Sequence, residues 1–113
     1  MTTNILFTCV GRRNYLINYF KEALNGCGKI FASDVDIYAP AMIDADVALV
    51  VPNVHDINYI PTITELIKAY NINAVISLND FELPILSKHK DEIKMQTGAK
   101  IIIYKVHIID LAY

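Results

Sequence analysis

The sequence predicts an α/β domain built on a doubly wound, mostly parallel sheet of five strands, a Rossmann-like fold. Two observations lead to this prediction: short apolar runs alternate along the chain with segments of helical periodicity, and the runs are apolar on both faces. Strands buried on both faces are typical of parallel sheets that helices cover on each side. A length of 113 residues suits one domain with its own core. We therefore treat residues 1–113 as a single domain.

The expected strands are short apolar runs that contain β-branched and aromatic residues. They cover residues 4–10, 29–34, 46–51, 73–78 and 99–104. Helices are expected where apolar side chains recur every three or four positions, over residues 14–26, 59–70 and 81–96. Asp56 or Asn58 is the expected cap of the second of these helices, and Asp80 of the third. Residues 39–45, "APAMIDA", form a connection of small residues before the third strand.

The end of the sequence carries a further helical pattern. Residues 106–113, "VHIIDLAY", place apolar side chains at helical spacing, and no cap, glycine or polar tail follows them. We expect the chain to be the leading domain, or a truncated product, of a longer protein. A short frayed terminal helix is the alternative.

Composition limits the classes of partner. Ten basic and twelve acidic side chains give a net charge of -2, so no overall basic field attracts nucleic acid or anionic lipid. No apolar run approaches the ~18 residues that cross a bilayer, and no secretion signal is recognisable, which predicts a cytoplasmic protein without a membrane partner. The chain is 54% hydrophobic, above the ~45–50% of an average soluble domain. Part of this excess is expected to face a partner, and pairing into a homodimer is plausible.

The first candidate site is the turn after the first strand. Ligands of open α/β sheets collect at the carboxyl ends of the strands. Gly11 precedes a helix there, and Arg12 and Arg13 supply planar, charged donors that suit a carboxylate or phosphate. The stretch lacks the additional glycines of dinucleotide and P-loop motifs. Adjacent helical positions do not share a face, so only one arginine should point inward. A turn glycine with two solvated arginines is the alternative.

Acidic and amide side chains follow the second and fourth strands. Asp34 and Asp36 could bind a hydroxylated ligand or an amine, or could simply form a turn. Asn79, Asp80 and Glu82 could contact a ligand, or could start the helix that follows them. The three histidines and two cysteines lack metal-ligand spacing, so we expect no metal site. Cys9 and Cys27 are separated by a helix and are expected to be free thiols, and no catalytic residue is assigned.

Four stretches carry a family resemblance: "NILFTCVGRRNYLINYFKEAL", "ASDVDIYAPAMIDADVALVVP", "DINYIPTITELIKAYNINAVISLNDFELPILSKHKDEI" and "TGAKIII". In this order they resemble the N-terminal, or pre-ATP-grasp, domain of ATP-grasp ligases, in particular proteins similar to the carbamoyl-phosphate synthase large subunit. The most specific pieces are the "GRR" turn, the "D-x-D" before "APAMIDAD", the "VP" after the third strand and "ND-x-ELP". "VDIYAP" departs from the proline-containing turn expected after the second aspartate, which leaves a shared substrate open.

The resemblance implies the substrate-side domain of a carboxylate–amine ligase. Such enzymes phosphorylate a carboxylate with ATP, and an amine or related nucleophile then attacks the acylphosphate. ATP and magnesium would be bound by an ATP-grasp domain absent from this chain, so the chain would be catalytically incomplete and would bind no cofactor itself. The turn residues would face the substrate, a small carboxylate or other anion, and the polar residues would share one rim: Gly11, Arg12, Arg13, Asp34, Asp36, Asn79, Asp80 and Glu82.

Two other classes of protein fit the same alternation of strands and helices. A free-standing module could bind a nucleotide, a dinucleotide or a small anion through Gly11 and Asp34, which lies about where dinucleotide folds place a ribose-binding carboxylate. A phospho-receiver domain is disfavoured, because the first strand ends in Cys9, Val10 and Gly11 and not in an acidic pair that binds metal.

Overall fold

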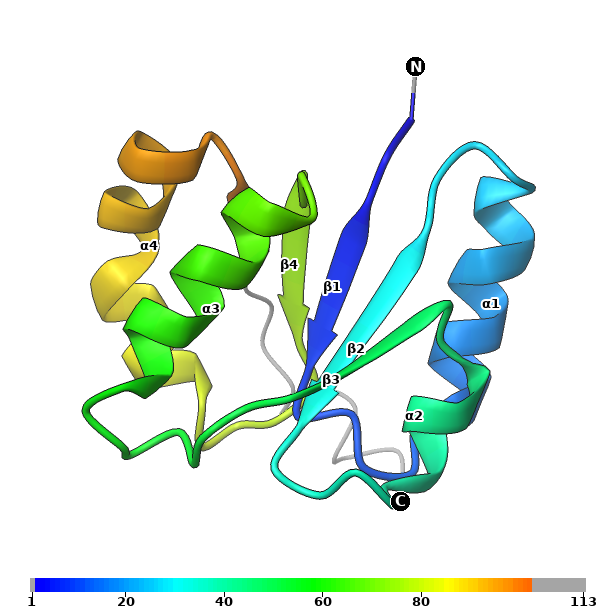
Figure 1. Ribbon diagram of the computed structural model, residues 1–113, viewed down its shortest axis with the longest axis horizontal. Coiled ribbons are helices and arrows are strands. Elements are labelled where there is room, and N and C mark those ends of the chain that lie inside the picture. The colour runs from blue at the N-terminus through cyan, green and yellow to red at the C-terminus, as the bar shows by residue number, and fades with distance from the viewer. Residues whose placement is uncertain (1, 103–113) are drawn as a thin grey trace.

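The computed structural model describes residues 2–102, which form a five-stranded sheet with helices on both faces (Figure 1). All of the strand pairs are parallel, in the order β3-β2-β1-β4-β5. The strands are β1 (Ile5–Thr8), β2 (Ile30–Asp34), β3 (Val47–Val50), β4 (Ala74–Ser77) and β5 (Lys100–Ile102). The predicted fold class is therefore confirmed, and each of the strands β1 to β4 is shorter than its apolar run.

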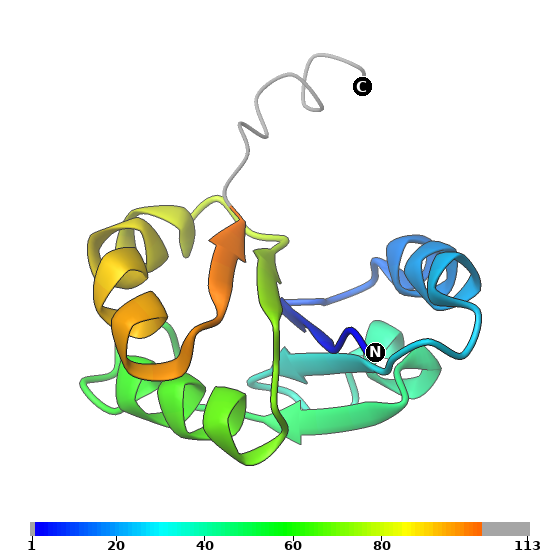
Figure 2. The same cartoon turned by 90° about the horizontal axis from the view of Figure 1, so that it is seen from above.

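The helices divide between the two faces of the sheet (Figures 1 and 2). On one face lie α1 (Asn14–Leu24) and α2 (Pro40–Asp44), and on the other lie α3 (Tyr59–Ala69) and α4 (Leu83–Thr97). The chain moves outward from β1 through β2 to β3 and then returns to the far side of β1 as β4. The connections that leave β1 and β4 therefore part in opposite directions, which creates a topological switch point between these strands.

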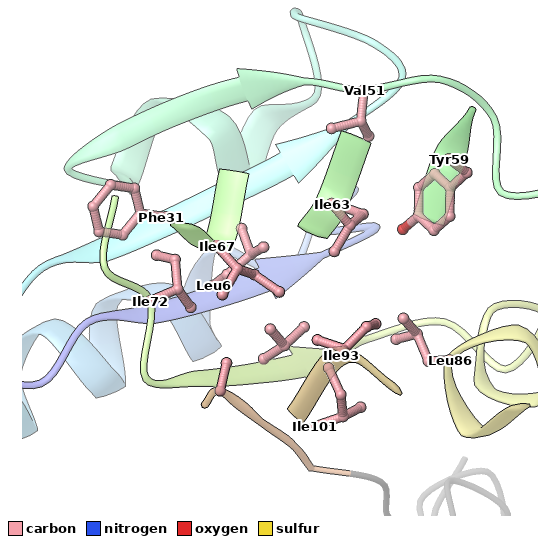
Figure 3. Packing of buried hydrophobic residues seen from close by; sticks show 12 residues of the cluster. Leu6, Phe31, Val51, Tyr59, Ile63, Ile67, Ile72, Leu86, Ile93 and Ile101 are labelled. Carbon is pink, nitrogen blue, oxygen red and sulfur yellow. The ribbon is translucent and has the colours of Figure 1, made fainter. Parts of the chain in front are cut away.

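Each face of the sheet carries its own apolar cluster. Leu6 and Val75 of the central strands pack with Ile63 and Ile67 of α3 and with α4 on one face. Figure 3 shows this cluster, with Phe31 at one end and Tyr59 at the other. The second cluster packs α1 and α2 against the opposite face. Burial on both faces explains why the sequences of the inner strands β1, β2 and β4 are largely apolar.

Helix α2 was not expected from the sequence. It is five residues long and begins at Pro40, whose fixed φ and missing N–H suit a first helical turn. Neighbouring segments hold it: the N–H of Ala41 donates to the carbonyl of Gly11 at 2.9 Å, and the Asn14 amide donates to Asp44 at 2.7 Å. Contacts that are distant in sequence, and not helical periodicity, therefore form this helix.

The expected helix caps are confirmed only in part. Asn58, one of the two expected caps, does precede α3, whereas α4 follows Glu82 and not Asp80. Neither the Asn58 nor the Glu82 side chain makes a capping hydrogen bond within residues 2–102. Helix α4 begins two residues later than the sequence predicts. The helical pattern over residues 106–113 and the end of the fifth predicted strand lie outside the described residues. None of the helices formed by residues 2–102 is both long enough and apolar enough to span a membrane.

Candidate functional site

A pocket of about 360 Å³ opens at the carboxyl ends of the strands, beside the switch point. This volume falls within the range of roughly 300–1,000 Å³ that is common for small-molecule sites. The connections after β1, β2, β3 and β4 all contribute to its wall. The lining residues are Cys9, Gly11, Arg13, Asp34, Val35, Val51, Pro52, Asn53, Val54, His55, Tyr59, Asn79 and Phe81.

The glycine turn is fixed by an aspartate from the neighbouring strand. Gly11 has a φ of 49°, in the left-handed region that glycine adopts without steric cost. Its N–H donates to Oδ2 of Asp34 at 3.0 Å, and the other oxygen of Asp34 accepts the N–H of Asp36 at 3.1 Å. Asp34 thus ties the turn after β1 to the turn after β2, and both oxygens of its carboxylate accept backbone hydrogen bonds.

The two arginines have different environments. Arg13 is half-buried and lines the pocket, whereas Arg12 is exposed and lies outside the lining. The guanidinium of Arg13 folds back over the turn, because its Nη1 lies 3.9 Å from the point where a Cβ on Gly11 would stand. Arg13 therefore presents the positive charge of the pocket wall, opposite in sign to Asp34.

Asn79 forms the turn that leads into α4. Its Oδ1 accepts the N–H of Phe81 at 2.7 Å, and its carbonyl accepts the N–H of Glu82 at 3.1 Å. The side chain of Asn79 is half-buried and lines the pocket, which leaves its amide N–H groups as the donors for a ligand. Asp80 is exposed and does not cap the helix. The sequence predicts that Asp80 begins this helix, but the side chain that forms the turn belongs to Asn79.

Glu82 lies beneath the pocket and not on its rim. Its side chain is fully buried, and three hydroxyl groups donate to it. Thr8 Oγ1 and Ser77 Oγ each donate to Oε1 at 2.5 Å, and the hydroxyl of Tyr59 donates to Oε2. A buried carboxylate needs such partners, because removing it from water unpaired is costly. The prediction that Glu82 lies on the open rim is therefore wrong.

The register of the sheet explains where the hydroxyl groups come from. Thr8 pairs with Ser33 on one side and Ser77 on the other, so these three residues form one row across the central strands at their carboxyl ends. All three are fully buried, and Ser33 Oγ has no hydrogen-bond partner within residues 2–102. Hydroxyl residues at the last position of β1 and β4 and the next-to-last position of β2 are a sequence signal that could have identified this row.

Tyr59 is a further site residue that the sequence analysis did not predict. It is the first residue of α3 and is 1% exposed. Its spacing with Ile63 and Ile67 places all three on one buried helix face, which is the signal that was available in the sequence. Burial and then the negative charge of Glu82 raise the pKa of the Tyr59 hydroxyl above its usual range. The hydroxyl group is therefore neutral and acts as a donor to Glu82.

Cys9 lines the pocket but is poorly suited to nucleophilic chemistry. Burial, followed by the negative charge of Glu82, raises the pKa of its thiol well above the usual range. The thiolate is the reactive form of cysteine, so this environment suppresses reactivity. Cys9 also has a φ of 54°, which is uncommon for a residue with a side chain. Cys9 and Cys27 are both free, as expected.

The structure brings half of the expected site residues to one pocket. Gly11, Arg13, Asp34 and Asn79 line it. The other four expected residues lie outside this lining: Arg12, Asp36 and Asp80 are exposed, and Glu82 is buried below. The lined space offers a cation, a carboxylate and an amide, which together can hold a small polar molecule.

The fold and the pocket define a Rossmann-like domain with a pocket at its switch point. Comparison with known sequence families gives a match over residues 5–102 to the family described as "PylC-like, N-terminal domain". The chain therefore belongs to this family, which is a pre-ATP-grasp domain of ATP-grasp ligases. This finding confirms the expected membership among pre-ATP-grasp domains. A comparison with curated proteins found no match.

Proposed function

We propose that this domain holds the substrate of an ATP-dependent carboxylate–amine ligase and that it is catalytically incomplete by itself. The observation that carries the proposal is the pocket at the switch point, lined by Arg13, Asp34 and Asn79, in a chain of the pre-ATP-grasp family. The ligand would be a small carboxylate or another small anion. ATP and magnesium would be bound by the ATP-grasp part of such a ligase, and the likeness to carbamoyl-phosphate synthase belongs to the same proposal.

Arg13 is the residue that would bind the anion. A guanidinium group can donate two parallel hydrogen bonds to a carboxylate, and such charge-assisted bonds are stronger than neutral ones. The half-buried position reduces competition from water, because ion pairs gain strength as the surrounding dielectric falls. Asn79 could donate to the same ligand through its free amide N–H groups.

The alternative function, binding of a nucleotide or dinucleotide, has less support from the site. The Gly11 N–H that would approach a phosphate donates to Asp34. Asp34, which would bind a ribose hydroxyl in that function, accepts backbone N–H groups at both oxygens. The turn also contains one glycine where a pyrophosphate-binding turn uses several. These contacts favour a smaller anion.

A thermal-shift panel separates the two functions. The 113-residue chain is heated with acetate, succinate, NAD, AMP or ATP, because a ligand that binds the folded state raises the melting temperature with its concentration. We expect saturable stabilisation by a carboxylate. A shift with NAD alone would support the alternative and contradict the proposal.

The ligase assignment has a separate test at the level of the gene. The DNA downstream of the Tyr113 codon is read for a segment that encodes an ATP-grasp domain. We expect such a segment in frame or nearby. A natural stop codon with no ATP-grasp segment in the neighbourhood would rule out the assignment while leaving ligand binding by this domain intact.

A further inference from the structure

The buried carboxylate of Glu82 joins several elements of the site through hydrogen bonds. Through Thr8 it joins the end of β1, and through Ser77 the end of β4. Through Tyr59 it joins the start of α3, while Glu82 itself precedes α4. Four elements are thus tied to one buried group.

Each of these ties lies next to a segment that lines the pocket. Thr8 immediately precedes Cys9 and the glycine turn, and Ser77 stands two residues before Asn79. Tyr59 lines the pocket itself and closes the connection after β3. The relative positions of three lining connections therefore depend on a carboxylate that is 0% exposed and outside the lining.

We infer that Glu82 is the positioning residue of the pocket, which holds the connections after β1, β3 and β4 at fixed separations without contacting the ligand. Its importance for ligand binding rests on the proposed function. The geometric claim can be tested on the free chain, so it can fail or succeed independently. A carboxylate suits this position, because its two oxygens only accept hydrogen bonds and can together accept those of all three hydroxyl groups.

Alkylation of Cys9 provides a ligand-free readout. Cys9 lines the pocket; Glu82, Asp34 and Tyr59 act on the pKa of its thiol, and Arg13 and His55 line the same pocket. Burial and, after it, the charge of Glu82 raise the pKa of the Cys9 thiol. Glu82→Gln removes the second of these causes and should move the onset of Cys9 alkylation by iodoacetamide to lower pH. Cys27 is exposed in the same chain and serves as the internal reference. Mass spectrometry of the two cysteine peptides gives both rates.

A second readout follows the connections directly. In ¹⁵N NMR spectra of the ligand-free chain, Glu82→Gln should shift the amide resonances of Gly11, His55 and Asn79 together. Thr8→Val should reproduce the shift at Gly11. In Thr8→Ser, which keeps the hydroxyl group, the Gly11 resonance should return to its wild-type position. Ile93→Val is the matched control, because Ile93 is 1% exposed in α4 and its apolar side chain belongs to the apolar cluster and cannot form a hydrogen bond with this carboxylate.

The outcomes are distinct. An earlier onset of Cys9 alkylation in Glu82→Gln, with shifts at all three connections and neither change in Ile93→Val, supports the positioning role. Shifts confined to residues next to position 82, or equal changes in Ile93→Val, overturn it, because general destabilisation would then explain the data. Should Glu82→Gln fail to fold, Tyr59→Phe and Thr8→Val carry the same comparison at one contact each.

Discussion

Replacing Tyr59 by phenylalanine removes one donor to Glu82 and keeps the ring that fills the core. Tyr59 is 1% exposed and Glu82 is 0% exposed, so water cannot easily take the place of the missing hydroxyl. Hydrogen bonds to charged groups contribute about 1.5–3 kcal/mol net. The buried position places this one in the upper half of that range, and we expect Tyr59→Phe to lower the free energy of unfolding by about 2–3 kcal/mol.

Urea unfolding followed by far-UV circular dichroism measures this loss, with an unchanged m-value and a lower midpoint. Tyr19→Phe is the matched control, because the Tyr19 side chain is 66% exposed and the change should cost close to nothing. A double-mutant cycle with Glu82→Gln should give a coupling energy of about 1 kcal/mol or more. A loss below ~0.5 kcal/mol, or one equal to that of Tyr19→Phe, would refute the assignment of this hydroxyl as a stabilising partner of Glu82.

Three further predictions follow. The pKa of the Tyr59 hydroxyl is raised in the folded state, so the hydroxyl loses its proton at lower pH in the unfolded chain. The free energy of unfolding should therefore fall above about pH 10, and less steeply in Tyr59→Phe. The same pH dependence of the free energy of unfolding in both proteins would contradict this prediction. Gly28→Ala would place a Cβ 1.7 Å from the carbonyl oxygen of Thr3, so it should destabilise by roughly 1–3 kcal/mol in urea titrations, and a neutral effect would contradict the close approach. Homodimer formation through exposed apolar side chains of α1, including Tyr19, predicts a mass that rises with concentration in light scattering, and a strict monomer would count against it.

The sequence predicted the elements that depend on local pattern. All five strands and the three long helices follow from apolar periodicity, because burial on one or two faces leaves a direct record in the order of residues. The positions of Gly11 and Asp34 at the carboxyl ends of neighbouring strands follow from chain order in a doubly wound fold, whereas the left-handed φ of Gly11 is seen only in the structure. The choice between Arg12 and Arg13 needed the structure, since neighbouring side chains differ only in direction.

What the sequence could not predict depends on contacts between distant residues. Helix α2 is held by hydrogen bonds to the glycine turn and to Asn14, and five residues carry no periodic signal. The sequence predicts Glu82 at an exposed helix start, whereas the strand register brings the hydroxyl groups of Thr8 and Ser77 together at its carboxylate. A carboxylate is buried only where several donors converge, and that convergence is a property of the assembled sheet.

The central claim is that this domain holds a small anion through Arg13. Isothermal titration calorimetry of Arg13→Ala and Arg12→Ala, with the carboxylate that gives the largest thermal shift, tests it most directly, because the two variants remove the same charge from a half-buried and an exposed position. A charge-assisted hydrogen bond of about 1.5–3 kcal/mol corresponds to a loss of affinity of roughly 10- to 100-fold. We expect that loss in Arg13→Ala, with near-wild-type binding in Arg12→Ala. Equal affinities in the two variants, or no carboxylate binding to the wild-type chain, would contradict the claim.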